Sequence, residues 1–223
     1  MRCIPEVHCA RDARNCQSRY NVDVKTALLS AYKKTDELAD FARELKQRGW
    51  DIWASAGTAK FLAEKGIEST DIATLVGEPI LGHRVVTLSR EIHAGLLARN
   101  EDEAELKRLG LRRIDLVYVD LYPLQEEIAR PGATEESVIE KTDMGGPALL
   151  RSAAKGGRIV LSSSSQFSKV LEYIYTNTED VPRGSSENKQ YLAGLAAEAE
   201  SAVAAYVAVS ADFNKRVASG EIT

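Results

Sequence analysis

The chain has 223 residues, of which 44% are hydrophobic and 28% are charged, and its formal net charge at pH 7 is −4. This length and composition are typical of a soluble globular protein with one well-developed core. The slight acidity excludes the broad positive field that holds nucleic acid, although a small anion can still bind in a local basic pocket. By inspection no apolar run approaches the length of a membrane span, so we expect no membrane partner.

The first 23 residues contain all three cysteines, Cys3, Cys9 and Cys16, and His8 stands beside Cys9. A metal or redox site is one interpretation, but the spacing lacks a close Cys-x-x-Cys pair. We expect a flexible tail over 1–23 instead. This tail has no apolar core of a secretory signal, and the remainder has no cysteine to cross-link, which favours a cytoplasmic location.

Strand and helix patterns alternate from Val24 onward. The expected strands are 25–31, 50–54, 114–119 and 158–161, with a short β-branched segment at 84–88. The expected helices are 35–49, capped by Thr35 and stopped by Gly49, and 59–65, 92–98, 102–109, 134–141, 146–155 and 165–175. The stretch 70–83 is expected to be irregular. This alternation predicts an α/β fold of three layers, a mostly parallel sheet flanked by helices.

A polar linker at 176–186 precedes a long helix that we expect from Glu187 to about Val217. One apolar stripe runs along this helix, formed by Tyr191, Leu195, Ala199, Ala202, Tyr206, Val209 and Phe213. We expect the stripe to pack on the domain or on a second subunit. The predicted organisation is therefore a tail at 1–23, an α/β domain at 24–186 and a packed helix at 187–223.

Polar residues gather where the predicted strands end. Ser30, Ser55 and Asp120 each stand at such an end, and parallel sheets bind ligands beyond the carboxyl ends of their strands. The turn Ser55-Ala56-Gly57-Thr58 offers hydroxyls and backbone N–H groups to a phosphate. The cations Lys33, Lys34 and Arg84 could assist it. The alternative is an ordinary turn beside solvated surface charges.

A second polar constellation surrounds one predicted helix. Asp143 precedes the glycines Gly145 and Gly146, which open the helix, and Lys155 lies at its other end. Free N–H groups at a helix start, with glycines that let a ligand approach, can stabilise a developing oxyanion. Tyr122, held extended by the proline that follows it, can orient or transfer a proton. The alternatives are an N-capping aspartate, a surface lysine and a tyrosine that packs over a strand end.

Five segments occur in the order seen in the IMP cyclohydrolase domain of the bifunctional AICAR transformylase/IMP cyclohydrolase family. They are Ser55–Lys60, Arg84–Leu88, His93–Ala98, Leu121–Pro123 and Asp143–Lys155. The match runs from about Val24 to Phe213, and the chain resembles a stand-alone cyclohydrolase with the methylglyoxal-synthase-like fold. The Asp–Gly–Gly–helix–Lys segment is specific to this family, whereas the Ser-x-Gly-Thr turn is shared across the superfamily.

The resemblance implies that the carboxamide nitrogen of 5-formamidoimidazole-4-carboxamide ribonucleotide attacks the formyl carbon, water leaves and IMP forms. The implied catalytic residues are Tyr122, Asp143 and Lys155. The implied substrate-binding residues are Ser30, Lys34, Ser55, Gly57, Thr58, Arg84, Thr87, Asp120, Gly145 and Gly146. No metal or organic cofactor is expected. The expected partners are the purine ribonucleotide, a second copy in a homodimer and a separate AICAR transformylase.

The sequence departs from the family pattern at several positions, among them Ser89 and Arg90, where the family has His-Pro. Val86 replaces an active-site lysine, Asp120 replaces an asparagine, and Ala56 replaces a glycine. Valine supplies neither charge nor a proton, so Lys33 or Arg90 is a candidate substitute. Two alternative functions stay open. One is a non-catalytic purine-nucleotide-binding or regulatory domain of the same fold, and the other is a methylglyoxal-synthase-like lyase that acts on a small phosphorylated triose.

Overall fold

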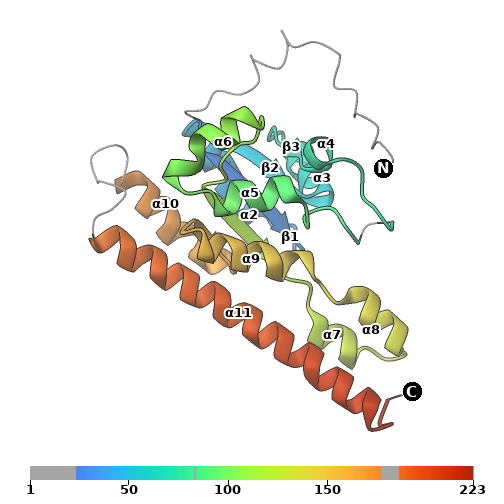
Figure 1. Cartoon of the computed structure of the whole chain (residues 1–223). Helices are drawn as coiled ribbons and strands as arrows, with labels where there is room; N and C mark the ends of the chain where they lie inside the picture. Colours follow the sequence, from blue (N-terminus) through green and yellow to red (C-terminus); the bar gives the residue numbers. More distant parts are fainter. Residues whose placement is uncertain (1–23, 83, 177–185, 223) are drawn as a thin grey trace, which may run out of the picture.

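The protein is described by a computed structural model that covers residues 24–82, 84–176 and 186–222 (Figure 1). The predicted tail with Cys3, Cys9 and Cys16 lies outside the described residues. A five-stranded sheet has the order β3-β2-β1-β4-β5, and all its neighbouring strands are parallel. The strands are β1 (Thr26–Ala31), β2 (Asp51–Ala54), β3 (Thr70–Asp71), β4 (Leu116–Asp120) and β5 (Ile159–Leu161). The predicted α/β fold is confirmed.

Helices flank this sheet (Figure 1). They are α2 (Asp36–Gln47), α3 (Ala56–Glu64), α4 (Ala73–Val76), α5 (Arg90–Leu97), α6 (Glu103–Arg108), α7 (Leu124–Ala129), α8 (Glu135–Lys141), α9 (Gly145–Lys155), α10 (Phe167–Thr176) and α11 (Ser186–Ala218), with the 3-10 turns η1 (Asn100–Asp102) and η2 (Ser164–Gln166). The predicted cap of α2 is confirmed, because the Thr35 hydroxyl accepts a hydrogen bond from the Leu38 N–H at 3.3 Å.

Four expectations about secondary structure were wrong. The stretch 70–83 contains β3 and α4, which are too short to show a period. Helix α7 follows Pro123 and was not predicted. Helix α3 begins at Ala56 rather than at residue 59. Residues 84–88 form no named strand, and the backbone pairing described there is an isolated antiparallel bridge between Ile80 and Val85.

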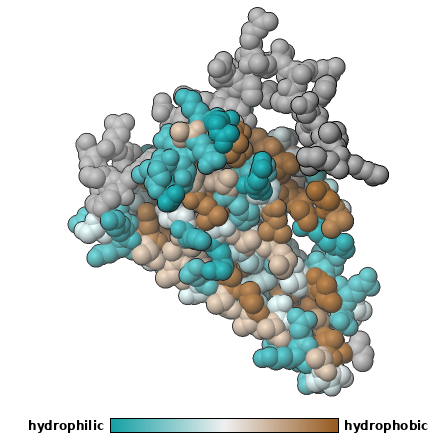
Figure 2. All heavy atoms as spheres, viewed as in Figure 1, coloured by the Kyte–Doolittle hydropathy of each residue, from teal (hydrophilic) through white to brown (hydrophobic). Residues whose placement is uncertain are grey.

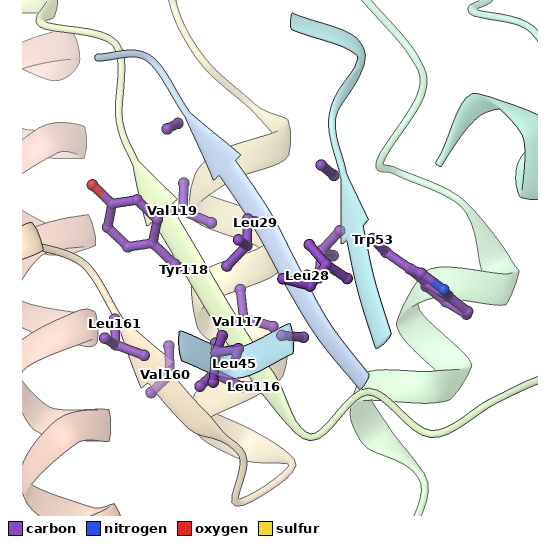
Figure 3. Close-up of a cluster of buried hydrophobic side chains, with 14 of the residues drawn as sticks. Leu28, Leu29, Leu45, Trp53, Leu116, Val117, Tyr118, Val119, Val160 and Leu161 are labelled. Carbon is purple, nitrogen blue, oxygen red and sulfur yellow. The ribbon is translucent and has the colours of Figure 1, made fainter. Parts of the chain in front are cut away.

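The two central strands carry the core. Leu28 and Leu29 of β1 and Leu116 and Val117 of β4 are fully buried, and Figure 3 shows them with side chains of neighbouring elements. Because both faces of these strands are covered, β1 reads as a continuous apolar run rather than an alternating one. A rigid sheet with this burial holds the loops at its carboxyl edge in defined positions.

Helix α11 packs along α9, β5 and α7, and in Figure 1 it runs past all three toward the C-terminus. Leu195, Ala199, Tyr206 and Phe213 of the predicted stripe are buried, as is Val203. The expectation that no apolar run reaches spanning length was wrong. An 18-residue window of α11 has a mean hydropathy of 1.4 with 22% of it buried, so by length and composition alone the helix could cross a membrane.

The apolar character of α11 comes largely from alanines, which inspection for large apolar residues overlooks. Figure 2 shows pale brown residues along this helix, interrupted by hydrophilic ones. The buried stripe of α11 contacts the domain, which is one of the two alternatives that the sequence left open. A core helix passes the same test of length and composition, so this one helix carries no membrane argument.

Candidate functional site

The carboxyl ends of β1 and β2 meet at the start of α3. Ser55 is the N-cap residue of α3, but its hydroxyl donates to Thr58 Oγ1 at 3.1 Å and caps no backbone N–H. Thr58 is fully buried, and its Oγ1 accepts from the Ala31 N–H at 3.1 Å. Thr58 therefore ties α3 to the end of β1, whereas the first N–H groups of α3 remain available to an anion.

Lys34 lies across the same turn. Its ammonium donates to the backbone oxygens of Ala31 at 2.5 Å and Tyr32 at 3.1 Å. A Cβ built on Gly57 would lie 3.7 Å from Lys34 Nζ. Burial lowers the pKa of Lys34, and the nearby Asp120 carboxylate opposes this effect. The ammonium and the start of α3 thus face each other across Gly57, in an arrangement that suits an anion.

Asp120 orders the loop that carries this ammonium. Its Oδ2 accepts from the Lys33 N–H at 2.6 Å, and its backbone oxygen accepts from the Tyr32 N–H at 3.2 Å. Ser30 pairs in register with Val119 one position before the end of β1. Asp120 therefore fixes the loop after β1 through two hydrogen bonds. Ser30 lies at the same carboxyl edge of the sheet.

The start of α9 forms a second polar centre. Asp143 Oδ1 accepts from the Gly146 N–H at 2.9 Å. A Cβ on Gly146 would lie 2.4 Å from Asp143 Oδ2 and 2.7 Å from Leu121 Cδ2, and a Cβ on Gly145 would lie 2.4 Å from Thr87 Oγ1. A side chain at either glycine would force these neighbouring side chains to move. The two glycines thus let Asp143, Thr87 and Leu121 close around the helix start.

The environment of Asp143 changes its acidity. Burial raises the pKa of Asp143, and the backbone N–H groups of Gly146 and Gly145 oppose the rise. A carboxyl group with a raised pKa holds or exchanges a proton closer to neutral pH than an exposed aspartate does. Asp143, Gly145, Gly146 and Thr87, all named as site residues from the resemblance, lie together at the start of α9.

Tyr122 lies near this centre with partners that the sequence analysis missed. Its phenol donates to Glu127 Oε2 at 3.2 Å, and Lys141 Nζ lies 5.3 Å from the centroid of its ring. Burial and then Glu127 raise the pKa of Tyr122, so the phenol keeps its proton. Arg130 holds Glu127 at 2.7 Å. The Glu127–Arg130 spacing of three residues was the sequence signal for this pair.

Tyr206 of α11 also reaches the site, although the sequence analysis placed it only in the packing stripe. The backbone N–H of Asp143 donates to the Tyr206 hydroxyl at 2.6 Å. Burial raises the pKa of Tyr206, so this phenol is also protonated. The long helix α11 therefore contacts the start of α9 through a polar atom as well as through its apolar stripe.

Two predicted site residues lie elsewhere in this structure. Arg84 is exposed and pairs with Glu140 of α8, with Arg84 Nη2 lying 2.6 Å from Glu140 Oε2. Its guanidinium therefore binds this carboxylate and is not directed at the start of α3. Lys155 ends α9, ten residues after Gly145, which is roughly 15 Å along the helix axis. Because α9 leads into the start of β5, Lys155 lies toward the amino ends of the strands. Asp143 and Lys155, which the resemblance places in one catalytic set, therefore lie at opposite ends of α9.

The structure shows the surroundings of Val86, which stands where the family has a lysine. Val86 is partly buried and packs against the main hydrophobic core. Both proposed substitutes are exposed. Arg90 lies 3.5 Å from Glu91, and Lys33 is bound to Asp120 through its backbone N–H. The cation beside Tyr122 is Lys141. Among the described residues, no group of three or more His, Cys, Asp or Glu side chains could hold a metal ion.

Comparison with known proteins agrees with this architecture. Residues 37–148 match the family model of the MGS-like domain. The chain is 38% identical over 196 residues to the bifunctional purine biosynthesis protein PurH of Lactobacillus acidophilus, covering 85% of this chain and 37% of that protein. It is 44% identical over 163 residues to PurH of Synechococcus elongatus, covering 70% and 32%.

A solved structure is also similar. The crystal structure of ForH superposes with a TM-score of 0.68 at 32% sequence identity, covering 85% of this chain and 97% of ForH. The chain spans about a third of the length of the PurH relatives, so their whole activity does not transfer directly. On the family match and on these relatives, the chain belongs to the MGS-like domain family and is related to the purine biosynthesis proteins.

Proposed function

We propose that this protein is an IMP cyclohydrolase, which closes the purine ring of 5-formamidoimidazole-4-carboxamide ribonucleotide. One observation carries the proposal. Asp143 lies half-buried against the N-terminal N–H groups of α9, on the same sheet edge as the anion cradle formed by Lys34 and the start of α3. A nucleotide has a phosphate and a reactive base at its two ends, and this edge offers a fitting polar centre for each.

In this proposal the 5′-phosphate binds at the start of α3, where backbone N–H groups and the Lys34 ammonium supply positive charge. Ser55 and Gly57 line the turn, and Thr58 shapes it through its bond to Ala31. Arg84 can join only if it leaves Glu140. The phosphate fixes the ribonucleotide so that its base extends toward Asp143 and Tyr122.

The chemistry is an intramolecular addition followed by loss of water. The carboxamide nitrogen attacks the formyl carbon, and Asp143 takes the proton that this nitrogen releases. The formyl oxygen becomes an oxyanion that the partial positive charge at the start of α9 stabilises. Asp143 returns that proton to the oxyanion, which becomes the hydroxyl of a cyclic adduct. It then takes the proton of the formamido nitrogen and passes it to the departing hydroxyl, so that water leaves and the ring C=N bond forms. Because both reacting groups belong to one molecule, much of the work is positioning.

Tyr122 and Lys141 complete the proposed centre. The Tyr122 phenol donates to Glu127, so its oxygen is oriented to accept a hydrogen bond from the carboxamide nitrogen. The Lys141 ammonium adds positive charge beside the Tyr122 ring. No step here requires Lys155. We further propose a cytoplasmic homodimer supplied with substrate by a separate AICAR transformylase.

A direct assay tests the proposal. Purified protein is incubated with the formamido ribonucleotide without added metal or folate, and IMP is followed by chromatography. We expect IMP well above the uncatalysed rate. A rate equal to the uncatalysed one at high protein concentration, together with tight binding of IMP by calorimetry, would favour the second candidate function. That candidate is a nucleotide-binding regulatory domain, which the packing of Val86 into the core favours.

A further inference from the structure

Tyr206 of α11 contacts the residue to which the proposed function gives the central role. Its hydroxyl accepts the Asp143 N–H at 2.6 Å, across 63 residues of sequence. The ring is 9% exposed and lies in a small cluster with Leu124, Val138 and Phe213. Because this cluster encloses the ring, the hydroxyl oxygen is held at one position rather than sampling solvent.

Asp143 is tethered both through its side chain and through its backbone in the described structure. Its side chain accepts from the Gly146 N–H at 2.9 Å, and its backbone N–H donates to Tyr206. The side-chain tether does not engage the peptide unit before Asp143, whose N–H is bound by Tyr206. Rotation of that unit moves the carboxylate relative to the start of α9. The second tether therefore sets where the carboxylate lies.

We propose that Tyr206 is a positioning residue that holds Asp143 in its reactive place through this backbone hydrogen bond. This inference rests on the proposed function for its catalytic meaning, but the anchoring itself is a property of the protein without substrate. Tyr206 acts through Asp143. It makes the final helix of the fold part of the proposed active site.

The test compares two tyrosine-to-phenylalanine variants on the same helix. Tyr206→Phe removes the acceptor and keeps the ring. Tyr191→Phe is the matched control, because Tyr191 stacks on Tyr173 with centroids 4.2 Å apart and its hydroxyl has no hydrogen-bond partner among the described residues. Native-state hydrogen exchange of the Asp143 amide, followed by nuclear magnetic resonance, reports the anchoring without any substrate.

We expect the Asp143 amide to exchange at least about tenfold faster in Tyr206→Phe, while β4 amides keep their wild-type rates. In Tyr191→Phe neither should change. In the ring-closure assay, Tyr206→Phe should lower kcat roughly 10- to 100-fold with little change in KM, because the phosphate cradle is untouched and only the reactive geometry loosens.

Three results would overturn the inference: unchanged Asp143 exchange in Tyr206→Phe, uniform acceleration that includes β4, or an equal loss in Tyr191→Phe. Uniform acceleration would show general destabilisation rather than anchoring. Faster exchange confined to Asp143 and its neighbours supports the anchoring even if the wild-type protein forms no IMP. Absence of IMP with the wild-type protein would sink the proposed function alone.

Discussion

The rings of Tyr32 and Tyr122 meet edge-on, with centroids 4.8 Å apart and an interplanar angle of 72°. Tyr32 belongs to the loop that carries Lys34, and Tyr122 belongs to the segment that follows β4. The Tyr32 N–H also donates to the Asp120 oxygen at 3.2 Å. Two aromatic rings in contact therefore connect the anion cradle with the proposed reactive centre. A displacement of one ring should displace the other.

A double-mutant cycle measures this contact. Tyr32→Leu, Tyr122→Leu and the double variant should show a coupling in the free energy of unfolding of about 0.5–1.5 kcal/mol, as edge-to-face pairs do elsewhere. Urea unfolding followed by circular dichroism gives the four values. As a control, Tyr175 of α10 replaces Tyr32 in the cycle and should add to Tyr122→Leu without coupling. A coupling near zero for the first pair would show that the rings touch without stabilising each other.

Asp143→Asn should separate stability from activity. Because burial raises the folded-state pKa of Asp143 above its unfolded value, the folded protein binds more protons between the two values. The wild-type free energy of unfolding therefore falls as pH rises through that window and stays lower above it. Asparagine does not titrate, so the variant should melt higher than wild type at pH 7 and lose this advantage below the ordinary pKa of an aspartate.

The same variant should lose turnover by roughly 100-fold or more, the usual cost of removing a positioned acid–base group. Calorimetric melting from pH 3 to 8 and the IMP assay provide the two measurements. A variant that is less stable than wild type at pH 7 would mean that the hydrogen bond from Gly146, and not burial, dominates the energetics of Asp143.

Lys34 and Arg84 offer a matched test of the anion cradle. Lys34→Met should weaken binding of a purine 5′-monophosphate about 10- to 100-fold, since hydrogen bonds to charged groups contribute about 1.5–3 kcal/mol. Arg84→Met should have a much smaller effect, because Arg84 is paired with Glu140. Calorimetry with the monophosphate and with the nucleoside isolates the phosphate contribution. Equal losses in both variants would mean that Arg84 leaves Glu140 when the nucleotide binds.

Lys155→Ala should retain turnover close to that of wild type. The roughly 15 Å between the ends of α9 keeps its ammonium from the Asp143 carboxylate. The IMP assay, run beside Asp143→Asn, makes the comparison. A loss at Lys155 as large as that at Asp143, in a variant with an unchanged melting temperature, would place Lys155 in the reaction and contradict the geometry described here.

Val86→Lys should destabilise the protein rather than restore a missing cation. Val86 packs against the core, so a lysine there must bury its ammonium or displace the loop that carries Thr87. The expected loss in the free energy of unfolding is roughly 1–3 kcal/mol. Val86→Met, an apolar replacement of similar length, serves as the control and should lose less. An increase in turnover with unchanged stability would show that position 86 faces the ligand.

The sequence was a good guide wherever the signal was local. The apolar runs of β1 and β4, the Thr35 cap and the glycines at the start of α9 each follow from neighbouring residues, and all were predicted. Lys155 lies at the end of its predicted helix, and a helix of that length separates its own ends. The predicted helix already excluded a meeting with Asp143.

The remaining contacts at the site could not be read from the sequence. Tyr206 is joined to Asp143 across 63 positions, and Arg84 is joined to Glu140 across 56. Such partners are set by how α8 and α11 dock, which depends on the whole core. A tyrosine in an apolar stripe predicts only that its ring is buried. The hydrogen-bond partner of its hydroxyl cannot be predicted from the helical period.

The dependence of Asp143 on α11 has a consequence for the order of events during synthesis. The sheet and the anion cradle consist of residues that leave the ribosome before Tyr206 does. The start of α9 is therefore exposed first as a helix end whose aspartate is held only by its own turn. It acquires its second tether only when the last helix docks, so the affinity for phosphate should develop earlier in the life of the chain than the capacity for ring closure.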